Sequence, residues 1–159
     1  MLSLLMISCG DDDPVLEPVE AMIVTNLEAI TTSSPGQPPA GDYVKFSFEK
    51  QTVVEGDDWD IAFRATTILV NGGFSAASDE PNRSGIAAGY VAVGAYGSIN
   101  SVDETLLSQD SETAYAIPVG SGNGWYNYDP QTYLITPIAG RTLVFKTHNG
   151  RYAKMEIQS

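Results

Sequence analysis

Three carboxylates and an arginine lie close together in the stretch GDDWDIAFRATTILVNGG, residues 56–73. The carboxylates are Asp57, Asp58 and Asp60, and Arg64 follows four positions after the last of them. Such a group can transfer protons as general acid and base, or bind a metal ion. Neighbours in a strand point to opposite faces, so Asp58 and Asp60 share one face with Arg64. A cation beside carboxylates keeps them ionised, which does not suit a general acid, and we therefore predict ion pairing or solvation.

The sequence offers little for nucleophilic catalysis. His148 is the only histidine and Cys9 the only cysteine, and no G-x-S-x-G motif is present. His148 begins a predicted polar turn, where we expect an exposed loop residue rather than a metal or haem ligand. The glycine-rich segment 120–124 lacks the lysine of a phosphate-binding loop. We predict that the protein is not an enzyme and has no metal site.

An aromatic cluster, WYNYDP, occupies residues 125–130. In a strand, Tyr126 and Tyr128 share a face and Trp125 lies on the other. The preceding glycine-rich loop gives a flat ligand access to these rings. Tyrosine is a known ligand of ferric haem iron, whereas paired tyrosines on a strand also pack across strands. Both interpretations remain open at this stage.

The first residues resemble a bacterial lipoprotein signal. Residues 1–8 are apolar, the small Ser8 precedes Cys9, and an acidic run follows at 11–13. We predict a signal segment at 1–8, lipidation of Cys9 and a lipid-anchored position on the cell surface at the outer membrane. No other run approaches the ~20 apolar residues of a membrane helix, so the lipid would be the only membrane contact. The alternative is a frayed apolar terminus with a buried cysteine.

Composition restricts the partners further. The 159 residues carry 20 acidic and eight basic side chains, a formal net charge of −12. This charge repels phosphates, and we do not expect nucleic-acid binding. A single cysteine also rules out an intrachain disulfide.

The chain divides into a tether and a β domain. Residues 9–41 contain five of the nine prolines and most of the early acidic residues, so we predict a lipidated linker with a possible edge strand at 22–24. From 42 to 159, β-branched and aromatic runs alternate with turn residues, which predicts one all-β domain, largely antiparallel and sandwich-like, built from short strands and hairpins. We expect strands within 43–54, 59–63, 66–70 and 86–96, with Trp59, Ile61 and Phe63 on one buried face. At most one short helix is expected, at 101–109.

The C-terminal hairpin allows a prediction of register. A three-residue loop at 148–150 places Phe145 opposite Ala153 and Leu143 opposite Met155. A two-residue loop would instead place Phe145 opposite a lysine. We prefer the first register because it separates apolar from charged side chains. The chain stops soon after this hairpin, so we expect a possible C-terminal truncation.

The order of several motifs resembles the HmuY-like haemophore family of bacterial surface lipoproteins. The resemblance covers about residues 43–159 and includes W-D-hydrophobic-A-hydrophobic at 59–63, N-G-G at 71–73 and Y-A-K-M at 152–155. It implies a lipid-anchored β protein on the surface of Gram-negative anaerobes. It also implies capture of haem or a related porphyrin from host haemoproteins, without catalysis, and delivery to an outer-membrane haem transporter for iron acquisition.

The sequence departs from this family at the expected iron ligands. Relatives use pairs of histidines or methionines in the region that corresponds to about 105–135, and this chain has neither type between Met22 and His148. Either Tyr126 or Tyr128 ligates haem iron, or the porphyrin is held by apolar contacts alone. The remaining alternative is a non-haem surface binding module or adhesin that recognises glycan or protein.

Overall fold

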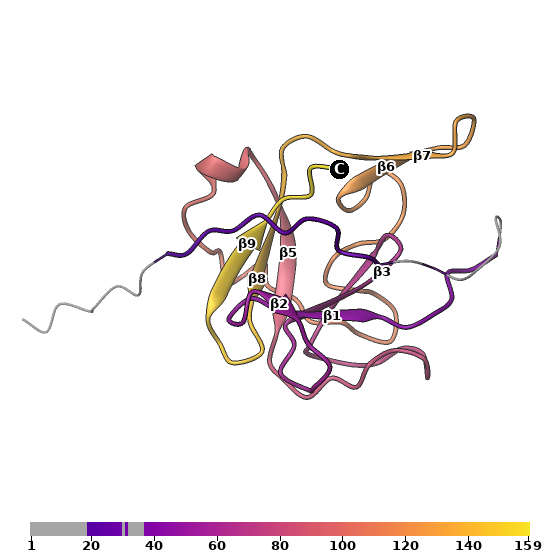
Figure 1. The fold of residues 1–159 in the computed structure, drawn as a ribbon. Helices are drawn as coiled ribbons and strands as arrows, with labels where there is room; N and C mark the ends of the chain where they lie inside the picture. Colours follow the sequence, from indigo (N-terminus) through magenta and orange to yellow (C-terminus); the bar gives the residue numbers. More distant parts are fainter. Residues whose placement is uncertain (1–18, 30, 32–36) are drawn as a thin grey trace, which may run out of the picture.

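Short strands make up most of the regular structure in the computed structural model, which describes residues 19–29, 31 and 37–159 (Figure 1). Nine strands and one three-residue 3-10 helix, η1 (Tyr96–Ser98), form in this part of the chain. The strands pair antiparallel into sheets of four, three and two strands. The predicted all-β fold is confirmed. The predicted signal segment 1–8 and Cys9 lie outside the described residues.

The first sheet has the strand order β2-β1-β3-β4. It confirms the strands predicted within 43–54, 59–63 and 66–70. Because β3 lies between two neighbours and both its faces are covered, three of its four residues are buried. Its strands are β1 (Val44–Ser47), β2 (Thr52–Val53), β3 (Ile61–Arg64) and β4 (Thr67–Val70).

The second sheet has the order β5-β8-β9 and contains the C-terminal hairpin. Its strands are β5 (Ala88–Val93), β8 (Arg141–Lys146) and β9 (Tyr152–Met155). Phe145 pairs with Ala153 and Leu143 with Met155, which confirms the predicted register. Gly150 has a φ of +92°, a left-handed conformation that glycine adopts without strain, so the turn chemistry agrees with the register.

The hydrophobic core lies between the two larger sheets, whose strands cross in Figure 1. Phe46, Ile61 and Phe63 come from the first sheet, and Leu143 and Phe145 come from the second; all five belong to one buried cluster. The packed sheets therefore give the sandwich-like arrangement that the alternating pattern predicted.

Trp59 does not share a face with Ile61 and Phe63, so that part of the prediction is wrong. It is fully buried in a separate cluster with Ala62 and Leu69. The strand begins only at residue 61, and strict alternation therefore does not extend back to the tryptophan.

Two candidate elements do not form, for tertiary reasons, and for the described residues the expectation of at most one short helix is confirmed. Residues 22–24 form no strand. They belong to an extended segment, residues 19–29, which crosses the molecule in Figure 1 and which we call the strap; its Leu27 and Ala29 pack against the core. Residues 101–109 form turns instead of a helix. The Asp103 carboxylate accepts hydrogen bonds from Thr105, and Ser108 then pairs with the backbone of β5. Pairing with the sheet outweighs a helix of marginal length.

The sequence Asn71-Gly72-Gly73 joins distant loops. The fully buried Asn71 amide donates to the carbonyls of residues 57 and 59, and its oxygen accepts from the backbone of residues 84 and 85. A Cβ on Gly72 would lie 2.0 Å from the carbonyl oxygen of residue 87, so the backbone approaches too closely for a side chain. The motif is accounted for by packing.

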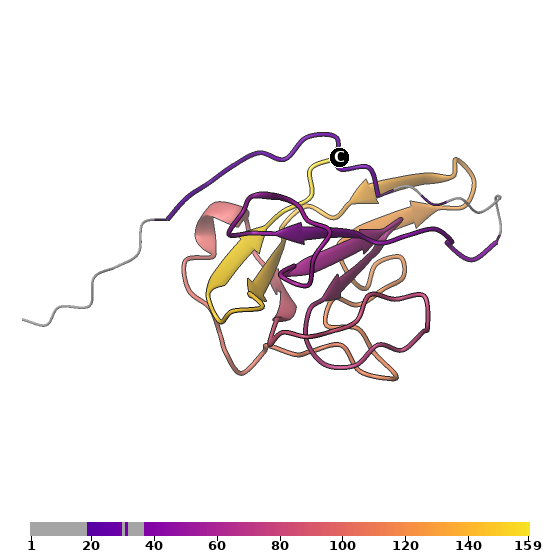
Figure 2. The same cartoon turned by 60° about the horizontal axis from the view of Figure 1, so that its bottom comes forward.

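The third sheet is the hairpin of β6 (Tyr126–Asp129) and β7 (Leu134–Pro137). Both views show its tip extending away from the two larger sheets (Figures 1 and 2). All residues from 127 to 136 are exposed, in contrast to the buried β3 and β8. The hairpin therefore presents side chains to solvent on both faces.

Candidate functional site

The two predicted haem contacts lie on the hairpin in different environments. Tyr126 is buried at its base, with 8% of its surface exposed, and its hydroxyl accepts a hydrogen bond of 3.2 Å from the Thr66 hydroxyl. Trp125 packs beside it, with ring centroids 5.0 Å apart, and donates from its indole to the Thr66 carbonyl. Tyr128 is 42% exposed. The base of the hairpin is thus fixed, while Tyr128 is free to meet a ligand.

Apolar side chains continue from Tyr128 across the hairpin. Tyr128 pairs directly with Ile135, so the two side chains share a face, and Ile135 is 47% exposed. Tyr133 and Leu134 at the tip are more exposed still. We call these four residues, Tyr128, Tyr133, Leu134 and Ile135, the hairpin patch. Tyr128 and Ile135 lie on one face of the hairpin, and Leu134 lies on the other. Exposed apolar side chains grouped in this way make the hairpin a candidate binding surface.

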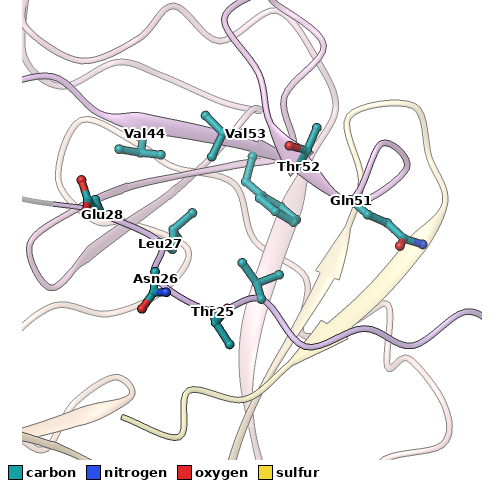
Figure 3. Close-up of a pocket in the computed structure, with 10 residues that line it drawn as sticks. Thr25, Asn26, Leu27, Glu28, Val44, Gln51, Thr52 and Val53 are labelled. Carbon is teal, nitrogen blue, oxygen red and sulfur yellow. The ribbon is translucent and has the colours of Figure 1, made fainter.

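A cavity lies away from the hairpin, between the strap and the first sheet. It measures about 400 Å³, and Figure 3 shows Leu27 of the strap and Val53 of β2 on its walls. Val24, Val44 and Phe46 contribute apolar groups, but polar groups make up the greater part of its lining. The described residues of its lining include no histidine, cysteine, methionine or tyrosine, so it offers no usual haem-iron ligand. A second cavity of about 190 Å³ lies beside Tyr115.

The carboxylates of the opening stretch do not act as one group. Asp58 is exposed and pairs with Lys50, which lowers the pKa of its carboxyl through their hydrogen bond. Arg64 pairs with Asp79 at 2.7 Å, not with Asp58 or Asp60. Ion pairing is therefore confirmed for Asp58 but with a different cation. The predicted sharing of Arg64 is wrong, because its side chain lies towards the Tyr43 ring at 4.1 Å.

Asp60 is buried, and the predicted solvated face is wrong here. Only 1% of its side chain is exposed. One carboxylate oxygen accepts from the amide of Phe48 at 2.6 Å, and the other accepts from the amide of His148 at 2.8 Å. The second oxygen also lies 2.7 Å from Nδ1 of the His148 ring. Asp60 thus joins the first sheet to the β8–β9 turn.

His148 is consequently not the exposed loop residue that we predicted. Its side chain is 20% exposed and held against Asp60. The turn folds back onto the first sheet, 88 residues away in sequence, and local turn chemistry gives no sign of such a contact.

A buried ionic cluster, absent from the sequence-based predictions, ties three loops together. Arg83 contacts Glu80 at 2.9 Å and Asp110 at 2.8 Å, and at most 2% of each side chain is exposed. Asp110 also accepts from the amides of Val70 and Ala116. Burial raises the pKa of Asp110, while these hydrogen bonds and Arg83 act in the opposite direction. The hydroxyl of Tyr115 also bonds to Glu80. We call Glu80, Arg83, Asp110 and Tyr115 the buried ionic cluster.

Tyr115 makes this cluster sensitive to alkaline pH. Its hydroxyl donates to Glu80 at 2.6 Å, and burial, followed by this contact, raises the pKa of the phenol. An unfolded phenol ionises near pH 10, before the folded one does, so the fold should lose stability as the pH rises above about 10. Denaturant unfolding at pH 9 and pH 11 measures this loss. Tyr115→Phe should show a smaller loss between these pH values; an equal loss would contradict the assignment.

Comparisons with known proteins add no assignment to these sites. Neither models of known protein families nor curated proteins match the chain. In the described ranges, no group of three or more histidine, cysteine or acidic side chains is arranged to hold a metal ion. Within these ranges there is also no helix of the length and hydrophobicity that crossing a membrane requires.

Proposed function

We propose that the protein is a non-catalytic, lipid-anchored lipoprotein of the outer cell surface that binds haem or a related porphyrin on the hairpin patch. The observation that carries the proposal is the exposed aromatic and aliphatic face at Tyr128 and Ile135, which lies directly beyond the fixed Tyr126. A porphyrin is a flat, largely apolar ring, and aromatic side chains stack on such surfaces. The resemblance to HmuY-like haemophores supports the same ligand class.

Tyr128 and Tyr126 would have different roles in this function. Tyr128 is exposed and can contact the ring or ligate ferric iron, which is the chemistry that tyrosine supplies to haem. Tyr126 would have to give up its contact with Thr66 to reach iron, so we assign it a supporting role under the patch. Captured haem would then pass to an outer-membrane transporter.

A titration with metal-free protoporphyrin IX and with haemin tests the proposal. Binding should quench the fluorescence of Trp125, which lies at the base of the hairpin. Ile135→Ser should weaken the binding of both ligands about 3- to 12-fold. Ile135 is 47% exposed, so ligand contact can bury only about half of a full isoleucine side chain, which contributes roughly 0.7–1.5 kcal/mol. Tyr128→Phe should change the Soret band of ferric haem only if this tyrosine ligates iron.

Val93→Ser is the matched control, since Val93 is an exposed aliphatic residue of β5 outside the patch. It should leave both affinities unchanged. No binding of either ligand by the unmodified chain would refute the proposal.

The hairpin patch also favours a second function, recognition of another protein. Its apolar side chains lie on both faces of the hairpin, whereas one porphyrin covers only one face. A surface adhesin would bind a host protein through the patch without taking up porphyrin. The same Ile135→Ser variant would then lose binding to that protein while neither porphyrin binds.

A further inference from the structure

The two ring nitrogens of His148 have different environments. Nδ1 lies 2.7 Å from the buried Asp60 carboxylate, and the main-chain amide of His148 donates to the same oxygen. A carboxylate accepts hydrogen bonds, so Nδ1 carries a proton, and in the neutral ring the lone pair is on Nε2. The other Asp60 oxygen accepts from Phe48, which fixes the carboxylate in turn.

Nε2 makes no hydrogen bond to the described residues. It is also not among their buried side-chain atoms without a partner, which are Trp59 Nε1 and Arg83 Nε, so we infer that solvent reaches it. The His148 ring is partly exposed, and within the described structure its interactions run through Nδ1. Its lone pair is therefore available to an external group.

The backbone around His148 is held in place. A Cβ on Gly85 would lie 2.7 Å from the Cβ of His148, so the turn packs directly on the backbone of that loop. The amide of Ile86 donates to the His148 carbonyl at 3.3 Å. With Asp60 on one side and this loop on the other, the ring has little freedom to turn away.

This geometry is typical of a metal ligand. A histidine that binds a metal almost always donates its other ring N–H to a carboxylate or carbonyl, which sets the tautomer and strengthens the ligand. The described residues offer no cluster of three ligands that would hold a bare ion. A single imidazole instead suits a metal that brings its own ligands and has one open coordination position.

We propose that His148 Nε2 binds the open position of a pre-chelated transition-metal centre, with Asp60 as its positioning residue. Iron in a porphyrin and copper in a small chelate share this chemistry. The site is distinct from the hairpin patch, because Asp60 precedes β3 whereas Thr66, which contacts Tyr126, follows it. The proposal therefore does not depend on porphyrin binding at the hairpin.

Two probes identify the source of the metal. Copper(II)–iminodiacetate is a neutral complex, so the negative charge of the chain does not attract it. Haemin tests iron in a porphyrin. With the unmodified chain, at least one probe should give the visible and electron paramagnetic resonance spectra of a nitrogen-ligated metal. His148→Ala should lose this signature, and Asp60→Asn should bind the same probe roughly 10-fold more weakly.

A footprinting experiment avoids dependence on folded variants. Diethylpyrocarbonate modifies accessible imidazole nitrogen, and His148 is the only histidine. The probe that binds should slow this modification in the unmodified chain. Unaltered modification with both probes, or a metal spectrum unchanged in His148→Ala, would overturn the proposal.

Metal-free protoporphyrin separates this proposal from the hairpin function. It has no coordination position, so its binding should be weakened by Ile135→Ser and unaffected by His148→Ala. Protoporphyrin binding without a His148-dependent metal spectrum would leave the hairpin function and refute the histidine site. A His148-dependent copper spectrum without porphyrin binding would support the histidine site and refute the hairpin function.

Discussion

Replacing Arg83 with alanine should lower the free energy of unfolding by about 3–5 kcal/mol, the usual effect of removing one partner from a buried ion pair. The variant would leave the carboxylates of Glu80 and Asp110 in the interior without their cation. Both carboxylates keep other hydrogen bonds, but a buried charge without a counter-charge is costly. Urea or guanidinium unfolding followed by tryptophan fluorescence measures the change.

Arg151→Ala is the matched control for this experiment. Arg151 and Glu49 form an ion pair 3.7 Å apart in which both side chains are at least half exposed. Exposed pairs contribute little, and this variant should unfold close to the midpoint of the unmodified protein. Equal losses for the two arginine variants would show that the buried ionic cluster does not stabilise the fold as its burial indicates.

Replacing Asp60 with alanine should cost about 3 kcal/mol of stability, because a buried donor left without an acceptor costs roughly 1–3 kcal/mol. The amides of Phe48 and His148 and the His148 ring all lose their acceptor. Asp60→Asn keeps an acceptor oxygen and should lose less. The measurement is again the free energy of unfolding.

Asp58 provides the internal comparison two residues away. Its side chain is 42% exposed and pairs with Lys50 at the surface. Asp58→Ala should leave the unfolding midpoint essentially unchanged. If both aspartate variants behaved alike, the assigned clamp between the first sheet and the β8–β9 turn would be wrong.

The sequence was most informative where local patterns decide the structure. The hairpin register at Phe145 and Leu143 follows from apolar alternation and from a turn that ends in glycine, and the structure confirms it. Three strand regions of the first sheet were also located correctly. In the C-terminal hairpin, apolar alternation and a local turn fix the register, so few distant contacts are needed.

Prediction failed where distant parts of the chain meet. A prediction from alternation assumes that one face of the strand is exposed to solvent, but both faces of β3 are covered. Asp60, just before this strand, is therefore buried and accepts hydrogen bonds from distant parts of the chain. The Asp60–His148 contact spans 88 residues, and Arg83 reaches Asp110 across 27. Spacing in the sequence carries no information on such contacts. Tyr126 and Tyr128 were placed on one strand correctly, but their unequal burial depends on Thr66.

The separate sheet of β6 and β7 has a consequence for hydrogen exchange. A two-stranded hairpin is marginally stable alone, and here its tip is exposed while Trp125 and Tyr126 anchor only its base. Its outer amides should open and exchange without unfolding of the core, as a local unit of low stability. A ligand on the hairpin patch would slow that exchange selectively, so part of its binding free energy would be spent on ordering the surface that recognises it.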